Sequence, residues 1–329
     1  MKKILLTLAC VFGMSMAALA VQNSAVMLQH DGNITTYEPN QINDAIEAAK
    51  DGDVIYLTAG DFPGFTINKQ ISVKGSGMQT VIKGTVKVEN PESILNNVFV
   101  GYMQIDGTSG DISFYVNSRV KGLRLSQCRI VKGISYEAIT EGSYIDRCEL
   151  QYSNRGLDIS ATYEETVTVN GVSSTYTRSC VQGLTITNSI INSGYGHNGV
   201  SLDVTFINCI ISSRSHQLHL FGVKFINSIL IPSSTLYLYK SDLINSSYNG
   251  VVLDNDCKLT DCYDVKIDDY TSEDLVTNGY LGNDGTVIGP MGGNTPYTLE
   301  PALPHVTKAD MKVDPDKQQL NVTLTVSPK

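Results

Sequence analysis

Short apolar strands recur along the middle of the chain, and each ends in an Asn-Ser pair, an Asn-Cys pair or a close substitute. The clearest copies are residues 186–190 (ITNSI), 206–210 (FINCI) and 225–229 (FINSI). The second residue of the pair falls at positions 128, 148, 189, 209, 228, 246 and 262, so the steps are 20, 41, 20, 19, 18 and 16 residues. A repeat of about twenty residues, built from strands too short to bury a face alone, is typical of a solenoid whose coils stack into one core.

The asparagine at a fixed place in each repeat indicates a tight bend, because Asn adopts the left-handed backbone region more readily than most residues. The step of 41 residues spans two repeats, and one of them is predicted to contain a hairpin around residues 164–178, with Asn170-Gly171 as its turn. We therefore expect an all-β solenoid of about ten coils from which one hairpin projects.

The N-terminal part carries a resemblance to a known family. Residues 42–84 read INDAIEAAKDGDVIYLTAGDFPGFTINKQISVKGSGMQTVIKG. This segment resembles the opening of pectin-lyase-like right-handed parallel β-helices, with an end-cap helix, a G-D-x-I-x-L first coil and a coil ending in G-x-G. The helix also follows from its own pattern, since Ile42, Ala45, Ile46 and Ala49 fall on one face. The resemblance covers residues 38–270 and implies a right-handed parallel β-helix capped by this helix, without implying an activity.

The first twenty residues are typical of a secretory signal peptide. Lys2 and Lys3 precede an apolar stretch, and Ala18-Leu19-Ala20 is a typical cleavage site. We expect cleavage after Ala20 and export by the Sec route to the periplasm, the outer surface or the extracellular space. Lipidation of Cys10 is the alternative. No later apolar run approaches the length of a membrane span.

The remaining boundaries follow from composition. Residues 21–37 form a lead-in to the β-helix domain, residues 271–304 are a turn-rich linker, and residues 305–329 predict a short C-terminal β-hairpin tail. The tail is similar to endings of uncharacterised secreted β-helix proteins of gut Bacteroidetes.

Charge and cysteine content limit the partners. The chain has 24 Lys+Arg against 33 Asp+Glu, a net charge of -9, which argues against nucleic-acid binding.

Cys128, Cys148 and Cys209 occupy the repeat position that Ser holds elsewhere, so we expect buried reduced thiols, while Cys257 and Cys262 could bridge a turn. No cysteine spacing matches a metal site, and calcium enters only as a possible bridge to anionic polymers. The oligomeric state is left open.

Apolar pairs two residues apart predict inward positions along one sheet, because alternate side chains of a strand point the same way. Their outward neighbours are Asp158, Asp203, His219, Phe221, Tyr237, Tyr239 and Asp254, among others. We expect these aromatic and acidic side chains to form one exposed column, with ring faces available to sugar rings. Phe221, Tyr237, Tyr239, His219 and Asp203 are the candidate ligand-binding residues.

Three hypotheses about function follow. The leading one is an exported non-catalytic protein that binds a polysaccharide or other glycan along this face. The second is a polysaccharide lyase or glycoside hydrolase acting in the same groove, with Asp203, Asp254, Asp158 and His219 as weak catalytic candidates. Residues 196–199 (GHNG) resemble the G-H-G element of polygalacturonases, but no Asp-Asp pair precedes them. The third is a structural spacer or adhesin of the cell envelope.

Overall fold

The computed structural model describes residues 24–107, 112–151, 156–192, 200–213, 218–232, 236–267, 271–300, 305–314 and 319–327. The expected signal peptide, the alternative lipidation at Cys10 and the motif at residues 196–199 lie outside the described residues. The chain divides into two compact units, Met1–Leu299 and Glu300–Lys329.

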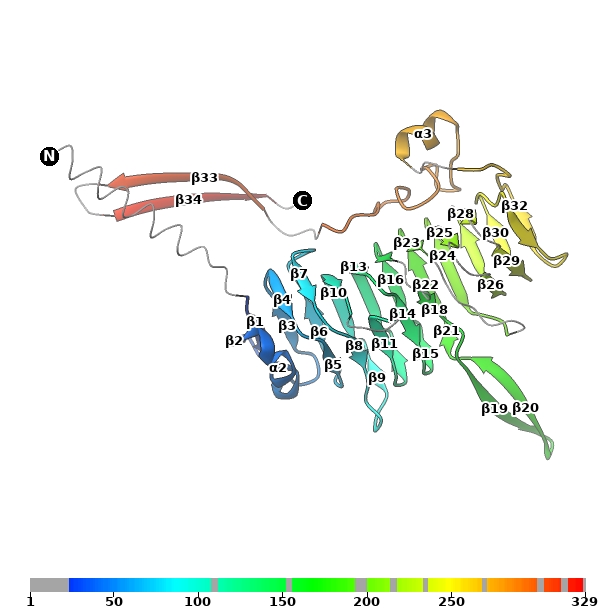
Figure 1. Cartoon of the computed structure of the whole chain (residues 1–329), viewed down its shortest axis with the longest axis horizontal. Coiled ribbons are helices and arrows are strands. Elements are labelled where there is room, and N and C mark those ends of the chain that lie inside the picture. The colour runs from blue at the N-terminus through cyan, green and yellow to red at the C-terminus, as the bar shows by residue number, and fades with distance from the viewer. Residues whose placement is uncertain are drawn as a thin grey trace. The chain divides into compact units, whose positions relative to one another are not determined.

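Strands dominate the first unit, and most of them pair in parallel with the strand one repeat further along (Figure 1). Ile186 pairs with Phe206, for example, and Phe206 pairs with Phe225. The largest sheet consists of β1 (Val26–His30), β2 (Asn33–Tyr37), β3 (Val54–Leu57), β4 (Gly60–Phe62), β6 (Ser72–Lys74), β7 (Thr80–Ile82), β10 (Phe99–Ile105), β13 (Arg124–Ile130), β16 (Tyr144–Asp146), β17 (Glu149–Leu150), β22 (Leu184–Thr187), β23 (Ile190–Asn192), β24 (Val204–Ile207), β25 (Ile210–Ser213), β27 (Lys224–Ile226), β28 (Ile229–Pro232), β30 (Asp242–Ile244) and β32 (Lys258–Thr260).

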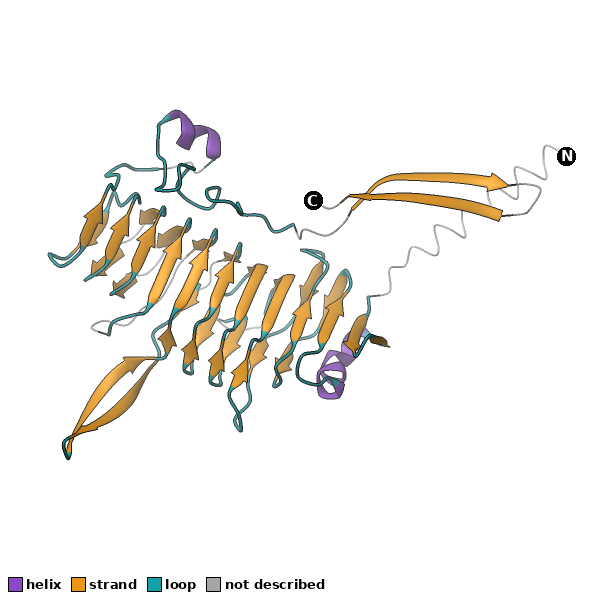
Figure 2. Ribbon diagram, turned by 180° about the vertical axis from the view of Figure 1, so that it is seen from behind, coloured by secondary structure: helices purple, strands orange, loops and turns teal. Residues whose placement is uncertain are grey.

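Three smaller parallel sheets complete the stack, and Figure 2 shows the strands lying side by side in successive rows. The first consists of β5 (Phe65–Ile67), β8 (Val86–Val88), β11 (Phe114–Val116), β14 (Ile134–Tyr136) and β18 (Leu157–Asp158). The second consists of β9 (Leu95–Asn96), β12 (Val120–Lys121), β15 (Thr140–Glu141) and β21 (Val181–Gln182). The third consists of β26 (Leu218–Phe221), β29 (Leu236–Tyr239) and β31 (Val251–Leu253). The prediction of an all-β chain is confirmed.

Each repeat bends at the position that the sequence indicates. The backbone φ angles of Asn188, Asn208, Asn227 and Asn245 are 45°, 52°, 50° and 46°, all in the left-handed region. The next residue then points into the core, and its side chain is fully buried at Cys128, Cys148, Ser189, Cys209, Ser228 and Ser246. At these four bends a polar amide therefore points away from the core, while a small side chain points into it, as predicted.

The six described cysteines are free thiols. Cys128, Cys148 and Cys209 lie in the core, as predicted, and burial raises the pKa of Cys209 to about 12. The bridge considered between Cys257 and Cys262 is not formed. Their thiols instead donate to two different carbonyls, those of Leu238 and Leu243.

A short helical segment covers one end of the stack. The 3-10 turn η1 (Pro39–Gln41) leads into α2 (Ile42–Ala48), which buries Ile42, Ala45 and Ile46 against strands β1 and β5. This is the apolar face that the sequence pattern predicts. Strand β1 pairs antiparallel with β2 and β3, so the covered end also differs in strand direction from the rest of the sheet.

The predicted hairpin is formed by β19 (Thr162–Val169) and β20 (Val172–Ser179), and it projects from the stack (Figure 1). Its turn residues Asn170 and Gly171 have φ angles of 50° and 78°, as a two-residue Asn-Gly turn requires. In the second unit, β33 (His305–Asp314) and β34 (Gln319–Ser327) form an antiparallel pair.

Residues 271–299, expected as most of a turn-rich linker, pack on the first unit. They begin with α3 (Ser272–Thr277), a helix that the sequence analysis did not predict. Leu275, Val287 and Ile288 form a small core with Ile210 and Ile229 of the stack. We call residues 279–298 the strap, because they run back over the bends from Asn227 toward Gln127.

Candidate functional site

The residues chosen from the sequence gather on the three-stranded sheet. His219 pairs with Tyr237, and Phe221 pairs with Tyr239, across strands β26 and β29. The intervening leucines are buried, while the four rings are only partly covered. The predicted alternation of inward leucines and outward aromatic side chains is therefore confirmed on these two strands. We call His219, Phe221, Tyr237 and Tyr239 the aromatic cluster.

The rings of the aromatic cluster share one orientation. The His219 and Tyr237 rings lie 4.5 Å apart, centroid to centroid, with 8° between their planes. The Phe221 and Tyr239 rings lie 6.0 Å apart with 22° between their planes. The Tyr239 hydroxyl also lies 3.3 Å from Nδ1 of His219, within hydrogen-bond distance.

This geometry changes the expectation about the ring faces. The centroid distance between His219 and Tyr237 is close to the spacing of neighbouring strands, about 4.8 Å, so their faces overlap. Stacked rings turn their edges, rather than their faces, toward solvent. The surface therefore offers C–H edges, ring nitrogens and phenolic hydroxyls, and a sugar would meet hydrogen-bonding groups more than flat apolar faces.

Opposite charges border the aromatic cluster. The Lys240 ammonium lies 5.4 Å from the centroid of the Phe221 ring, within cation–π distance. Asp254 follows β31, and its carboxylate accepts hydrogen bonds from the backbone amides of Lys240 (3.1 Å) and Asp256 (3.1 Å). Partial desolvation raises the pKa of Asp254, but hydrogen bonds from Cys257 and from these backbone amides outweigh it and lower the pKa below its usual value. Asp254 is therefore ionised near neutral pH, which does not suit a general acid.

Asp203 comes just before β24. Thr205 pairs with Lys224, and extending this register back sets Asp203 level with Gly222, one residue beyond Phe221. Its carboxylate borders a cavity of about 310 Å³ at the root of the hairpin. The other lining residues are Tyr163, Glu165, Arg178, Ser179, Val181, Gln182 and Ser201.

Asp158 was expected on the exposed face, and this is wrong. Its residue is only 3% exposed, and its Oδ1 accepts hydrogen bonds from the backbone amide (3.0 Å) and the hydroxyl (2.6 Å) of Ser160. Strand β18 is two residues long, and the chain turns back over the carboxylate immediately afterwards. Asp158 belongs to the five-stranded sheet rather than to the sheet with the aromatic cluster.

The acidic candidates are thus not brought together. Strands β26 and β29 lie between Asp203 and Asp254, and Asp158 is buried in another sheet. Hydrolysis by paired carboxyl groups needs both on one scissile bond. Among the described residues, no three His, Cys, Asp or Glu side chains are grouped as they would be around a metal ion.

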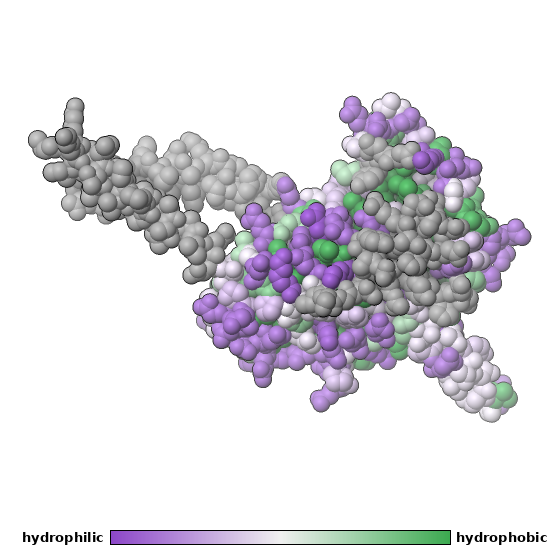
Figure 3. All heavy atoms as spheres, viewed as in Figure 1, coloured by the Kyte–Doolittle hydropathy of each residue, from purple (hydrophilic) through white to green (hydrophobic). Residues whose placement is uncertain are grey.

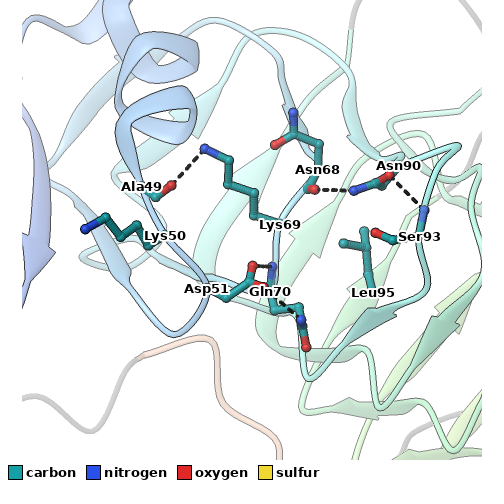
Figure 4. Close-up of a pocket in the computed structure, with 9 residues that line it drawn as sticks. All are labelled: Ala49, Lys50, Asp51, Asn68, Lys69, Gln70, Asn90, Ser93 and Leu95. Atoms are coloured by element: carbon teal, nitrogen blue, oxygen red, sulfur yellow. Dashed lines mark hydrogen bonds between the residues drawn. The ribbon is translucent and has the colours of Figure 1, made fainter.

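The polar cavity in Figure 4 lies beside the covered end of the stack and measures about 540 Å³. Lys69 reaches across it, and its ammonium donates hydrogen bonds to the carbonyls of Ile46, Glu47 and Ala49 at the end of α2. A cation at this position satisfies the unpaired carbonyls of the last helical turn. The groups drawn in Figure 4 are largely bound to one another, which indicates a structural role for this cavity.

Sequence reasoning missed Lys240 and the lining of the hairpin-root cavity. Asp203, Gly222 and Lys240 follow one another at steps of 19 and 18 residues, the same steps as the neighbouring bends. That spacing could have placed Lys240 at the bend equivalent to Gly222, and both residues have left-handed φ angles, 48° and 70°. The Glu165–Arg178 ion pair (3.0 Å) lies across the predicted hairpin and could have been found from its register.

No protein-family model, curated protein or solved structure matches this sequence. In the part of the chain that the structure describes, no helix is long and apolar enough to cross a membrane.

Proposed function

We propose that this chain is an exported, right-handed parallel β-helix protein that binds carbohydrate at the aromatic cluster without cleaving it. The parallel pairing of strands one repeat apart supports the β-helix, because such a path must cross over between strands of the same sheet. Parallel crossovers are almost always right-handed. Export rests on the signal peptide that the first twenty residues resemble.

The observation that carries the binding proposal is the aromatic cluster itself. Four partly exposed rings with a common orientation lie on two neighbouring strands over fully buried leucines. Such a patch is rigid, so little conformational entropy is lost when a ligand binds it. Its edges carry two phenolic hydroxyls and an imidazole, which can exchange hydrogen bonds with sugar hydroxyl groups.

The flanking charges indicate the kind of glycan. Lys240 and Asp254 add one charge of each sign at one end of the aromatic cluster, and the chain as a whole has a net charge of -9. A strongly anionic polymer would be repelled by this field. A neutral, hydroxyl-rich glycan fits the surface better.

The test is affinity electrophoresis of the full chain on a panel of neutral and anionic polysaccharides. We expect retention by at least one neutral glycan, and a loss of affinity of about tenfold or more in Tyr237→Ala and in Tyr239→Ala, which corresponds to about 1.4 kcal/mol. Tyr56→Ala is the matched control, because Tyr56 is a partly exposed tyrosine on the largest sheet, beside Lys74. Unchanged affinity in both cluster variants would overturn the proposed site.

A second assay on the same panel separates binding from catalysis. We expect no new reducing ends and no unsaturated uronate, because the acidic candidates are not assembled around one bond. Product from any polymer would overturn the non-catalytic proposal and leave the binding measurements intact.

A further inference from the structure

The hairpin of β19 and β20 has two chemically different faces. The register pairs Tyr163 with Arg178, Glu165 with Tyr176, Val167 with Ser174 and Val169 with Val172. These residues share one face, because directly opposed residues point to the same side of a sheet. The opposite face consists of Thr162, Glu164, Thr166, Thr168, Ser173, Thr175, Thr177 and Ser179. Hydroxyls on that face bond across the strands, as Thr166 and Thr175 do at 3.2 Å.

The first face, which we call the apolar face, carries the Glu165–Arg178 ion pair toward its base and valines toward its tip, and no element covers that tip among the described residues. Val169 and Val172 are 62% and 68% exposed, and Tyr176 is 48% exposed. Figure 3 shows the hairpin standing out from the body with apolar atoms at its tip. A two-stranded hairpin is marginally stable in water, whereas a wider sheet with one apolar face is stable.

The long edges of the hairpin are only lightly protected. Neither strand contains Pro or Lys, and both are eight residues long and rich in Thr, Ser and Val; β19 carries two charged residues, Glu164 and Glu165, whereas β20 carries only Arg178, near its end. Unblunted edges of this kind pair with other strands. In a two-residue hairpin the residues that close the turn, here Val169 and Val172, exchange backbone hydrogen bonds. Because hydrogen-bonded and non-hydrogen-bonded pairs alternate, the backbone amides of Ser173, Thr175 and Thr177 point to the free edge of β20.

We propose that β20 pairs antiparallel with β20 of a second copy of this chain, which joins two hairpins into one four-stranded sheet. A two-fold axis at Thr175 sets Tyr176 opposite Ser174 and Val172 opposite Arg178 of the other copy. The apolar faces of the two hairpins then become one continuous face. This dimer is independent of the proposed glycan site.

The charges select β20 over β19. Pairing β19 with its own copy about Thr166 would bring Glu164 and Glu165 of both copies to one seam. Each Glu165 is already paired with Arg178 of its own hairpin (3.0 Å), so the excess negative charge at that seam comes from Glu164, and like charges across a seam repel. In the β20 pairing the two Arg178 side chains lie six residues apart, about 20 Å. The eight-residue strands also hold the two bodies at opposite ends of the joined sheet.

Sedimentation velocity of the full chain tests the proposal. We expect a species of twice the 35.7 kDa monomer mass. Thr175→Pro removes the amide at the centre of the contact and should give a monomer. Thr166→Pro is the matched control. Thr166 lies directly opposite Thr175 on β19, so this variant loses an amide at the edge that is not used for pairing and should remain dimeric. A monomeric wild type, or a dimeric Thr175→Pro, would overturn the proposal.

Cross-linking distinguishes loss of the contact from loss of the hairpin. In the Thr175→Cys variant the two new cysteines lie directly opposite each other, with their Cα atoms about 5.5 Å apart. This distance is within the range of disulfides. Oxidised glutathione should convert them to one disulfide and be reduced to two molecules of glutathione. Thr166→Cys and the wild type should give no dimer band. Equal cross-linking in the two cysteine variants would reject the β20 contact.

Discussion

The side-chain amide of Asn188 donates a 2.7 Å hydrogen bond to the backbone carbonyl of Gly292, 104 residues further along the chain. The same amide donates to the carbonyl of Pro290 at 3.2 Å. Asn188 is 4% exposed, and Pro290 and Gly292 are also buried. The left-handed bend at Asn188 thus directs its amide outward and into the strap, so one residue both turns the repeat and holds a distant segment.

Asn188→Gly should separate these two roles. Glycine adopts the left-handed conformation freely, so the bend is retained while two buried carbonyls lose their donor. We expect the free energy of unfolding, measured in urea, to fall by about 1–3 kcal/mol. Asn245→Gly is the control, because Asn245 has the same bend and its side chain makes no hydrogen bond to the strap within the described residues. Equal losses in the two variants would contradict a role for the amide.

Removing the hydroxyl group should have opposite effects on stability at two tyrosines, Tyr136 and Tyr144. Tyr136 is buried in the core, its hydroxyl has no partner among the described residues, and burial raises its pKa. Tyr136→Phe should therefore leave stability unchanged or raise it by about 1 kcal/mol. The Tyr144 hydroxyl lies 2.9 Å from the Thr187 hydroxyl, which in turn donates to Asp146. Tyr144→Phe should cost about 1 kcal/mol, and thermal unfolding of both variants checks the contrast.

Asp53 makes the covered end of the stack sensitive to acid. Burial raises the pKa of Asp53, but the hydrogen bond from the Lys50 amide (2.7 Å) and the contact with His30 (2.8 Å) outweigh it, so the pKa lies below its usual value. The carboxylate therefore stabilises the fold above about pH 4, and this contribution is lost as the pH falls through the lowered pKa.

Asp53→Asn should lower the free energy of unfolding at pH 7 by about 1–3 kcal/mol. The difference from the wild type should begin to shrink below about pH 4, where the carboxyl of the unfolded chain becomes protonated, and should vanish below the lowered pKa of the native carboxyl. Urea unfolding at several pH values measures this difference. A constant difference from pH 7 down to pH 2 would contradict the assignment to the ionised carboxylate.

The repeat itself was predictable because it depends on local chemistry. Asn in a bend, a small side chain after it and an apolar strand before it are each fixed by a few neighbouring residues, as at Asn208-Cys209. The site was harder, because a change of one residue in the step between repeats moves every following side chain by one place. Asp203 was expected in the column of the aromatic cluster, whereas the pairing of Thr205 with Lys224, 19 residues further along, sets it level with Gly222.

The strap was not predictable for a different reason. Its glycines and prolines indicate turns, and nothing in their spacing identifies the bends that they cover. The contact between Asn227 and Asn283 joins residues 56 positions apart and depends on the completed stack. Asp158 was misplaced for a similar reason, since its burial follows from the return of the chain at Ser160.

The strap also changes how the stack comes apart. A linear array of repeats holds together through nearest neighbours, so its end repeats can fray one by one. Here one segment is bonded to Asn227, Asn188 and Gln127, which belong to repeats well separated along the stack. Fraying of any one of these repeats would break contacts that the others share. The strap thereby couples the repeats between Gln127 and Asn227 to one another, so that these repeats should unfold together rather than one by one.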